Sequence, residues 1–142
     1  MHPFPHRYTV ALSDRRLVSS TQAPIELGPP PQFGGSDTVW SPEELLLGAV
    51  LACVWTTFEA IARRDKLAIH HWSGSGTAVL DRGPGIPVFT SIELAVAVEV
   101  DVQDQELARD VLAKAEKHCI ISNALKVPVV VRATIGVTKL AS

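Results

Sequence analysis

The longest apolar segment of the chain covers residues 45–55 and contains no charged or strongly polar side chain. A helix start signal precedes it, because Ser41 suits an N-cap, Pro42 suits the first helical position, and Glu44 stands where a capping box needs an acidic residue. We therefore predict a helix over residues 41–64. Since no face of the apolar segment can be turned to water at low cost, we expect a buried central helix.

After this helix the pattern changes from helical spacing to alternation of apolar and polar positions. Residues 70–80 and 88–100 follow this alternation, and a segment rich in glycine and proline separates them, which predicts two strands joined by a long turn. In the second strand every second residue from Ile92 is apolar, while Glu93 and Glu99 lie on the other face. We expect one face of the sheet to be covered and the other to be at least partly wet.

The remaining segments complete an α+β pattern. Residues 7–20 predict a hairpin, residues 23–27 a third short strand, residues 105–118 an amphipathic helix and residues 127–137 a last strand. The expected order is β-β-(β)-α-β-β-α-β, which is of the α+β class. We find no repeat or linker, and we expect a single domain over residues 1–142.

Charge and composition exclude several function classes. The 142 residues are 46% hydrophobic and 20% charged, as in one globular domain. Thirteen Lys and Arg against fifteen Asp and Glu give a charge of -2 without a basic cluster, which argues against nucleic acid and an anionic membrane surface as partners. The apolar segment is shorter than the roughly 20 residues that span a membrane. We see no secretory signal and expect a cytoplasmic protein.

The two cysteines are the candidate nucleophiles. In a cytoplasmic chain they are expected to be inert buried thiols or redox-active groups rather than a structural disulfide. Cys119 follows His118 at a predicted helix C-terminus, where the helix dipole disfavours a thiolate, so Cys53 is the better nucleophile. A reactive thiol in mid-helix needs a nearby cation. Arg15 and Arg16 are the candidates, and two solvated charges on a hairpin are the alternative.

Other chemistries have weaker support in the sequence. The cysteine and histidine residues lack the spacings that are typical of zinc sites, so we expect no metal. There is also no phosphate-binding loop, dinucleotide fingerprint or Gly-x-Ser-x-Gly elbow. Redox chemistry of the thiols is what remains.

The residues around both cysteines resemble the two motifs of the OsmC/Ohr family, the osmotically inducible protein C and organic hydroperoxide resistance proteins. The segment Ser-Pro-Glu-Glu-Leu-Leu-Leu-Gly-Ala-Val-Leu-Ala-Cys at residues 41–53 resembles the central-helix motif with its peroxidatic cysteine. The segment His-Cys-Ile-Ile-Ser-Asn-Ala-Leu at residues 118–125 resembles the motif of the resolving cysteine. Chain length and the order of elements agree as well. The branch, OsmC or Ohr, is left open.

This resemblance implies a two-Cys thiol peroxidase. Cys53 would attack an organic hydroperoxide, become a sulfenic acid and condense with Cys119 to a disulfide, which an external dithiol, lipoyl-type or other, would reduce. No bound cofactor is implied. The alternative is a redox-sensing or small-molecule-binding protein on the same scaffold, without efficient peroxidase turnover.

The resemblance also assigns charged residues, with two departures from the family pattern. Glu43 matches a glutamate that holds an arginine against the cysteine thiolate. Ser13 falls where the organic hydroperoxide branch has that arginine, so that Arg15 or Arg16 substitutes for it or the role is absent. This departure favours the alternative function. Ile120 stands where many members have proline after the resolving cysteine.

Helix geometry adds a constraint on Glu43. Glu43 and Cys53 are ten residues apart on one predicted helix, about 15 Å along its axis at 1.5 Å per residue, so the two side chains cannot meet. The resemblance implies an intertwined homodimer with adjacent central helices, in which Glu43 of the partner subunit would approach Cys53. Small residues on the helix would allow this approach: Gly48, Ala49 and Ala52.

Four aromatic residues near these motifs are candidates for a pocket that favours alkyl or lipid hydroperoxides over hydrogen peroxide. They are Phe33, Trp40, Trp55 and Phe58. Packing in the hydrophobic core is the alternative for each of them.

Overall fold

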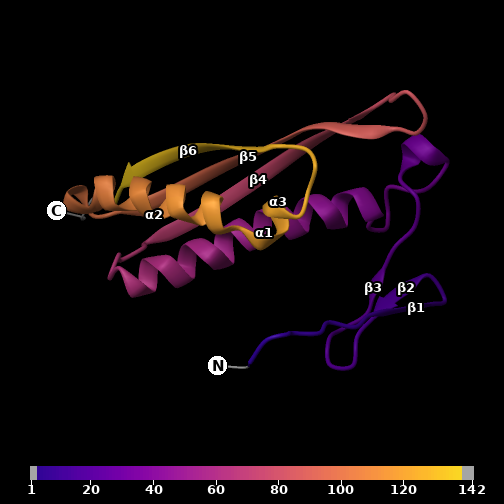
Figure 1. Ribbon diagram of the computed structural model, residues 1–142, viewed down its shortest axis with the longest axis horizontal. Helices are drawn as coiled ribbons and strands as arrows, with labels where there is room; N and C mark the ends of the chain where they lie inside the picture. The colour runs from indigo at the N-terminus through magenta and orange to yellow at the C-terminus, as the bar shows by residue number, and fades with distance from the viewer. Residues whose placement is uncertain (1–2, 139–142) are drawn as a thin grey trace. The chain divides into compact units, whose positions relative to one another are not determined.

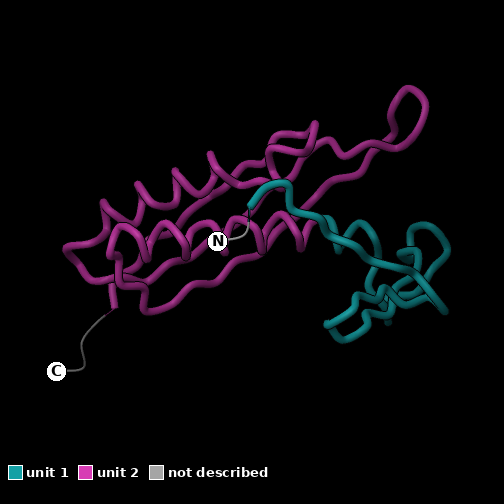
Figure 2. Tube along the Cα trace, turned by 60° about the horizontal axis from the view of Figure 1, so that its bottom comes forward, with its two compact units in different colours: residues 1–46 teal, residues 47–142 magenta. Residues whose placement is uncertain are grey.

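The computed structural model describes residues 3–138, which fold into two three-stranded sheets and three α-helices (Figure 1). The elements are β1 (Ala11–Ser13), β2 (Arg16–Val18), β3 (Ile25–Glu26), the 3-10 turn η1 (Pro31–Phe33), α1 (Pro42–Arg64), β4 (His71–Asp81), β5 (Val88–Val100), the 3-10 turn η2 (Val102–Asp104), α2 (Gln105–His118), α3 (Ile120–Asn123) and β6 (Val129–Val137). The predicted α+β class and element order are confirmed, and α3 is an addition. Two compact units divide the chain after Leu46 (Figure 2), and each is described by itself.

The first unit contains the small sheet β1–β2–β3, whose strands are shorter than predicted. β1 pairs with β2 from Ala11 to Ser13, and the turn that joins them consists of Asp14 and Arg15. Asp14 and Arg15 have φ angles of 50° and 62°, a left-handed conformation that ends the ladder on this side. The predicted loop after β3 contains η1 and returns to β3 through a hydrogen bond from Trp40 N to Glu26 O of 3.2 Å.

The start of α1 has the predicted capping box. The backbone N–H of Ser41 donates to Glu44 Oε1 at 3.1 Å, and the N–H of Glu44 donates to Ser41 Oγ at 3.2 Å. These two bonds satisfy amide groups that the first helical turn leaves without partners. The helix therefore begins at Pro42, as predicted, and ends at Arg64.

The predicted burial of α1 is confirmed along one face. Val50, Val54 and Phe58 are completely buried in the core of the second unit. The opposite face, which carries Ala52 and the 39% exposed Trp55, is open in the single chain. By length and composition α1 is the one helix among residues 3–138 that would be able to cross a membrane, a test that core helices of soluble proteins also pass.

In the second unit, α1 and α2 cover the same face of the sheet β4–β5–β6 (Figure 1). β4 runs antiparallel to β5, and β6 runs parallel to β5 in a register that places Ile92 beside Val129. Every second residue of β5 from Ile92 to Val100 is buried under the helices, while Glu93 and Glu99 are exposed on the other face. The prediction of one covered and one wet face is therefore confirmed.

Two glycines of β4 allow α1 to pack closely on the sheet. A Cβ atom on Gly74 would lie 2.9 Å from Leu51 Cδ1, and one on Gly76 would lie 3.0 Å from Leu47 Cδ1. Both distances are shorter than ordinary van der Waals contacts, so a larger residue at either position would require these leucine side chains to shift. The absence of side chains at these two glycines thus leaves room for Leu47 and Leu51 of α1 against β4.

The helix α2 covers the predicted range of residues 105–118, and no side chain caps its start. The 3-10 turn η2 precedes the helix, and neither Asp101, at the start of η2, nor Asp104, at the start of α2, makes a side-chain cap. Asp101 instead contacts His70 through Oδ1 and Nε2 at 2.8 Å. At the other end, Cys119 separates α2 from α3 and so belongs to both helix termini.

Candidate active site

Cys53 lies in the middle of α1, on a partly buried position that packs against the core. Its Sγ atom is 3.9 Å from the hydroxyl oxygen of Thr57, one helical turn further on. The thiol is free. Cys53 is thus less deeply buried than the core residues Val50 and Val54 on the same helix.

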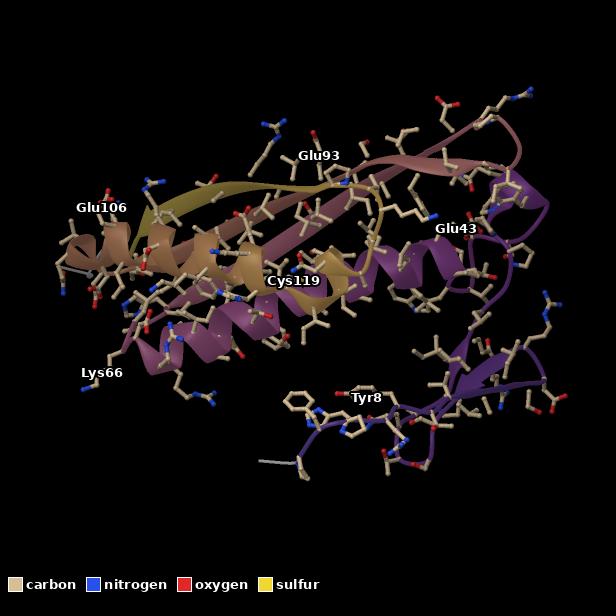
Figure 3. All side chains as sticks on the ribbon, in the orientation of Figure 1. Tyr8, Glu43, Lys66, Glu93, Glu106 and Cys119 are labelled. Carbon is tan, nitrogen blue, oxygen red and sulfur yellow. The ribbon has the colours of Figure 1, made fainter. Side chains whose placement is uncertain are left out.

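Cys119 is completely buried at the junction of α2 and α3 (Figure 3). It is the N-cap of α3, and its sulfur takes the role that an oxygen usually plays there. Cys119 Sγ accepts hydrogen bonds from Ser122, from Oγ at 3.1 Å and from the backbone N at 3.5 Å. The short helix therefore holds this sulfur in one orientation.

The surroundings of Cys53 favour its thiolate form. Burial acts to raise the pKa of Cys53, but hydrogen bonds outweigh it and lower the pKa. The donors are the backbone of Ile121, the thiol of Cys119, the hydroxyl of Thr57 and the backbone of Ile120. Since the thiolate is the nucleophilic form of cysteine, this environment activates Cys53.

Cys119 has the opposite character. Burial raises the pKa of the Cys119 thiol and the neighbouring Cys53 adds to this effect, against the opposing hydrogen bonds from Ser122. Because the two sulfurs affect the pKa of each other through a hydrogen bond, the fold brings the two cysteines together. In this pair, ionisation is favoured at Cys53 and disfavoured at Cys119.

The charged site residues that the sequence predicts belong to the first unit. One carboxylate oxygen of Glu43, Oε2, is buried and has no hydrogen-bond partner among residues 3–138. Arg16 pairs with Glu26 at 3.6 Å, and Arg15 lies in the β1–β2 turn, with its guanidinium beside Gly28. Their roles toward Cys53 stay predictions. Within the described range, no group of three or more His, Cys, Asp or Glu side chains would be able to hold a metal ion.

The four aromatic candidates have different environments. Phe58 is completely buried in the core, and Trp55 contacts the ring of Trp72 with centroids 6.4 Å apart. Phe33 and Trp40 of the first unit are each 54% exposed. Whether any of them contacts a hydroperoxide stays a prediction, but the position of Phe58 agrees with the alternative of core packing.

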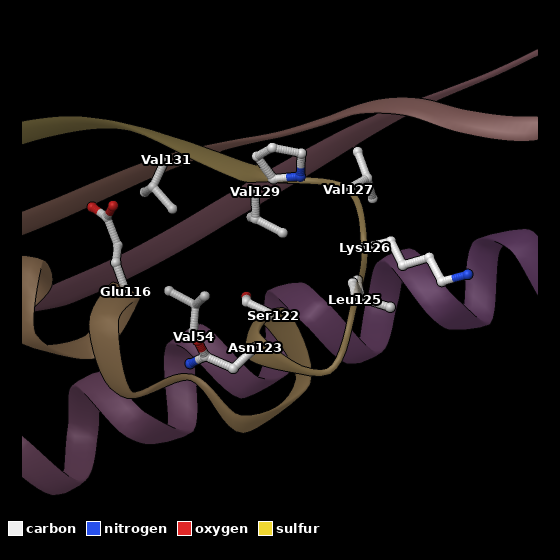
Figure 4. Close-up of a pocket in the computed structure, with 10 residues that line it drawn as sticks. Val54, Glu116, Ser122, Asn123, Leu125, Lys126, Val127, Val129 and Val131 are labelled. Carbon is white, nitrogen blue, oxygen red and sulfur yellow. The ribbon is translucent and has the colours of Figure 1, made fainter.

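A cavity of about 300 Å³ in the second unit is lined by Val54, which follows Cys53 in the chain, and by residues of α3 and β6 (Figure 4). Its polar lining includes Ser122, which bonds to Cys119, and Glu116, whose pKa is raised by burial. The apolar lining comes from α1 and from the segment around β6: Val54, Leu125, Val127, Pro128, Val129 and Val131. None of the four aromatic candidates lines this cavity.

Sequence reasoning assigned no role to the residues of α3 that contact the sulfurs. A signal was present, because Ser122 follows Cys119 at the spacing that separates an N-cap from the third helical residue. The sequence marks Ile120 only as a replacement of the proline that many family members have after the resolving cysteine. Proline has no backbone N–H, whereas Ile120 supplies one of the donors to Cys53.

We expect the substitution Ile120→Pro to weaken the activation of Cys53. Proline suits this position sterically, because Ile120 is the first residue of α3 and the preceding Cys119 is extended, with φ -66° and ψ 112°. Loss of one donor raises the pKa of Cys53, so at a fixed pH below that pKa the rate of alkylation should fall by about 2- to 10-fold. The rate is measured against pH with iodoacetamide, and mass spectrometry assigns the modified cysteine.

Ile120→Ala is the matched control for this substitution. It keeps the backbone N–H and removes a side chain that is 77% exposed, so the pH profile should stay that of the unmodified protein. An equal displacement of the profile in both variants would show that the side chain, and not the N–H, acts on Cys53.

The comparisons with known proteins agree with this geometry. The family model for the OsmC-like protein matches residues 35–134, which include both cysteines. Among solved structures, the chain is similar to an OsmC-like protein from Mycoplasma pneumoniae, with a TM-score of 0.77 and 19% identity over 94% of this chain and 99% of that one. It is also similar to an organic hydroperoxide resistance protein from Elizabethkingia anophelis, with a TM-score of 0.73 and 21% identity over 95% and 100% of the two chains.

No curated protein matches the chain. At the identities above, the likeness to solved structures establishes the fold, and the family match, which covers more than half of the chain, establishes the relationship. The resemblance of the two cysteine motifs is thereby confirmed. The chain belongs to the OsmC-like protein family.

Proposed function

We propose that this protein is a thiol-dependent peroxidase that reduces organic hydroperoxides. One observation carries the proposal: Cys53 and Cys119 are neighbours, with the pKa of Cys53 lowered and the pKa of Cys119 raised. A two-Cys peroxidase needs this asymmetry, because the first sulfur must attack as a thiolate while the second must wait as a thiol. The name of the Elizabethkingia anophelis protein supports the same substrate class.

The proposed reaction has two steps within the protein. The Cys53 thiolate attacks the terminal oxygen of the hydroperoxide, the O–O bond breaks, and an alcohol leaves after taking up a proton. Cys53 is then a sulfenic acid. The sulfur of Cys119 attacks the sulfur of Cys53, the S–O bond breaks, and the hydroxide leaves as water with the proton of Cys119.

An external dithiol would close the cycle. Its thiolate attacks the disulfide, and a second thiol of the same molecule releases the protein, so that both cysteines return to the reduced state. Cys119 is completely buried and Cys53 is half-buried, which favours attack at the sulfur of Cys53. No bound cofactor takes part in these steps, and the reducing cytoplasm is the compartment that suits them.

We also propose that the site is completed by a second copy of the chain. Two features support this. The face of α1 with Gly48, Ala49 and Ala52 is exposed in the single chain, and a carboxylate oxygen of Glu43 is buried without a partner among the described residues. In an intertwined homodimer with adjacent α1 helices, Glu43 of the partner subunit would hold an arginine, Arg15 or Arg16, toward Cys53.

The test is the consumption of cumene hydroperoxide by the purified protein with dihydrolipoamide or dithiothreitol as reductant. We expect catalytic turnover, with slower consumption of hydrogen peroxide under the same conditions, and light scattering of the same sample should give the mass of a dimer. Absence of turnover with either dithiol would favour the redox-sensing or small-molecule-binding alternative, which the serine at position 13 also favours. A fully active monomer would contradict the shared site.

A further inference from the structure

Ser122 makes two contacts with the sulfur of Cys119. Its hydroxyl lies 3.1 Å from Cys119 Sγ and its backbone N lies 3.5 Å from the same atom. Among the described residues, no other hydrogen bond to this sulfur from a backbone or hydroxyl group is present besides these two. The neighbouring Asn123 acts differently, because its Nδ2 donates to the backbone oxygens of Lys117 and Cys119. Asn123 therefore stabilises the backbone between α2 and α3, whereas Ser122 contacts the sulfur of Cys119 itself.

Disulfide formation places a particular demand on Cys119. The thiol must give up its proton as it attacks the sulfenic acid of Cys53, so negative charge develops on a sulfur that is 0% exposed. A charge that water cannot reach needs donors from the protein. The hydroxyl of Ser122 already points its hydrogen at the sulfur where this charge appears.

We propose that Ser122 is a positioning residue for the second step of the reaction, in which it orients Cys119 Sγ toward Cys53 and stabilises the charge that develops during disulfide formation. This inference rests on the proposed peroxidase function. In the step itself, a bond forms between the two sulfurs and the S–O bond of Cys53 breaks. The proton of Cys119 leaves with the hydroxide as water, and Ser122 keeps its own proton throughout.

A purely structural role for Ser122, as part of the cap of α3, makes a different prediction. The backbone N–H of Ser122 provides that cap and survives any substitution except proline. Removal of the hydroxyl alone should therefore slow disulfide formation while leaving the first step, the attack of Cys53 on the hydroperoxide, unchanged. A loss of local structure would instead impair both steps, because α3 also donates to Cys53.

The experiment compares Ser122→Val with Ser122→Thr. These two side chains have nearly the same shape and differ in the hydroxyl, and the cavity beside Ser122 leaves room for the extra methyl group (Figure 4). Each reduced protein is mixed with one equivalent of cumene hydroperoxide without reductant. Samples are quenched at intervals with dimedone, and mass spectrometry measures the trapped sulfenic acid of Cys53 and the disulfide.

We expect Ser122→Val to oxidise Cys53 at nearly the wild-type rate and to form the disulfide about 10-fold more slowly, since a hydrogen bond to a charged group is lost. The trapped sulfenic acid should accumulate accordingly. Ser122→Thr should behave as the wild type. In Asn123→Ala, the ratio of the rate of disulfide formation to the rate of Cys53 oxidation should also equal that of the wild type. Equal rates of disulfide formation in the valine and threonine variants would overturn the inference while leaving the peroxidase proposal intact.

A second measurement keeps the inference testable even if the peroxidase proposal fails. In a Cys53→Ser background, the ultraviolet absorbance of the thiolate reports the titration of Cys119 alone. Loss of the Ser122 hydroxyl should move this titration to higher pH, because the hydrogen bond stabilises the thiolate. An unchanged titration would overturn the role of Ser122, whereas a wild-type protein whose Cys53 resists hydroperoxide would overturn the proposed function alone.

Discussion

Replacing Cys53 by serine should reduce the consumption of cumene hydroperoxide to the rate of a protein-free control, whichever dithiol is supplied. The hydroxyl of serine is not ionised near neutral pH, and the hydrogen bonds that lower the pKa of Cys53 cannot make it a comparable nucleophile. Loss of a covalent nucleophile costs on the order of 10³-fold or more in rate. Steady-state assays with a coupled dithiol measure this loss directly.

Cys119→Ser is the control that separates the two cysteines. This variant keeps Cys53, so without reductant it should still consume about one equivalent of hydroperoxide per chain and then stop at the sulfenic acid. Dimedone should label Cys53 in this variant and should not label the reduced wild type. Activity that survives in Cys53→Ser would exclude the proposed mechanism. If Cys119→Ser failed to consume the first equivalent of hydroperoxide, Cys119 and not Cys53 would be the attacking sulfur.

The sequence predicted the parts of the fold that local patterns determine. The capping box of Ser41 and Glu44 placed the start of α1 correctly, since it depends on residues three apart. The alternation around Glu93 and Glu99 likewise defined β5 and its open face. Both signals are carried by neighbours along the chain, which is why they can be read without a structure.

The active-site environment was less accessible, because it depends on contacts between distant segments. The four-residue helix α3 is too short for a periodic pattern, yet its backbone donates to Cys53, about seventy residues earlier. The position of Cys119 after His118 predicted a less readily ionised thiol, and burial raises the pKa of Cys119 in the same direction, while the order of reactivity stays a prediction. The two motifs therefore identified the candidate thiols, whereas the groups that hydrogen-bond to them became visible only in the fold.

The substitution Phe58→Ala should lower the free energy of unfolding by about 3–5 kcal/mol. Phe58 is the largest of the completely buried side chains, and it joins α1 to the core formed by β5 and α2. Truncation removes buried apolar surface and leaves a cavity that the closely packed α1 cannot fill, because β4 already approaches it through Gly74 and Gly76. Denaturant unfolding of both proteins at one protein concentration measures the difference, since dimerisation would make stability depend on concentration.

Phe33→Ala provides the comparison for the same substitution at an exposed site. Phe33 is 54% exposed, so its truncation should change the unfolding free energy by no more than about 0.5 kcal/mol. Comparison of the two variants also decides whether Phe58 is a core residue or part of a substrate pocket, the two interpretations that the sequence allows. If Phe58 is a core residue, Phe58→Ala should lower the free energy of unfolding and change the preference among hydroperoxides only slightly. A substrate-pocket residue would instead leave the unfolding free energy near that of the wild type and raise the KM for bulky hydroperoxides, and this outcome would contradict the packing described above.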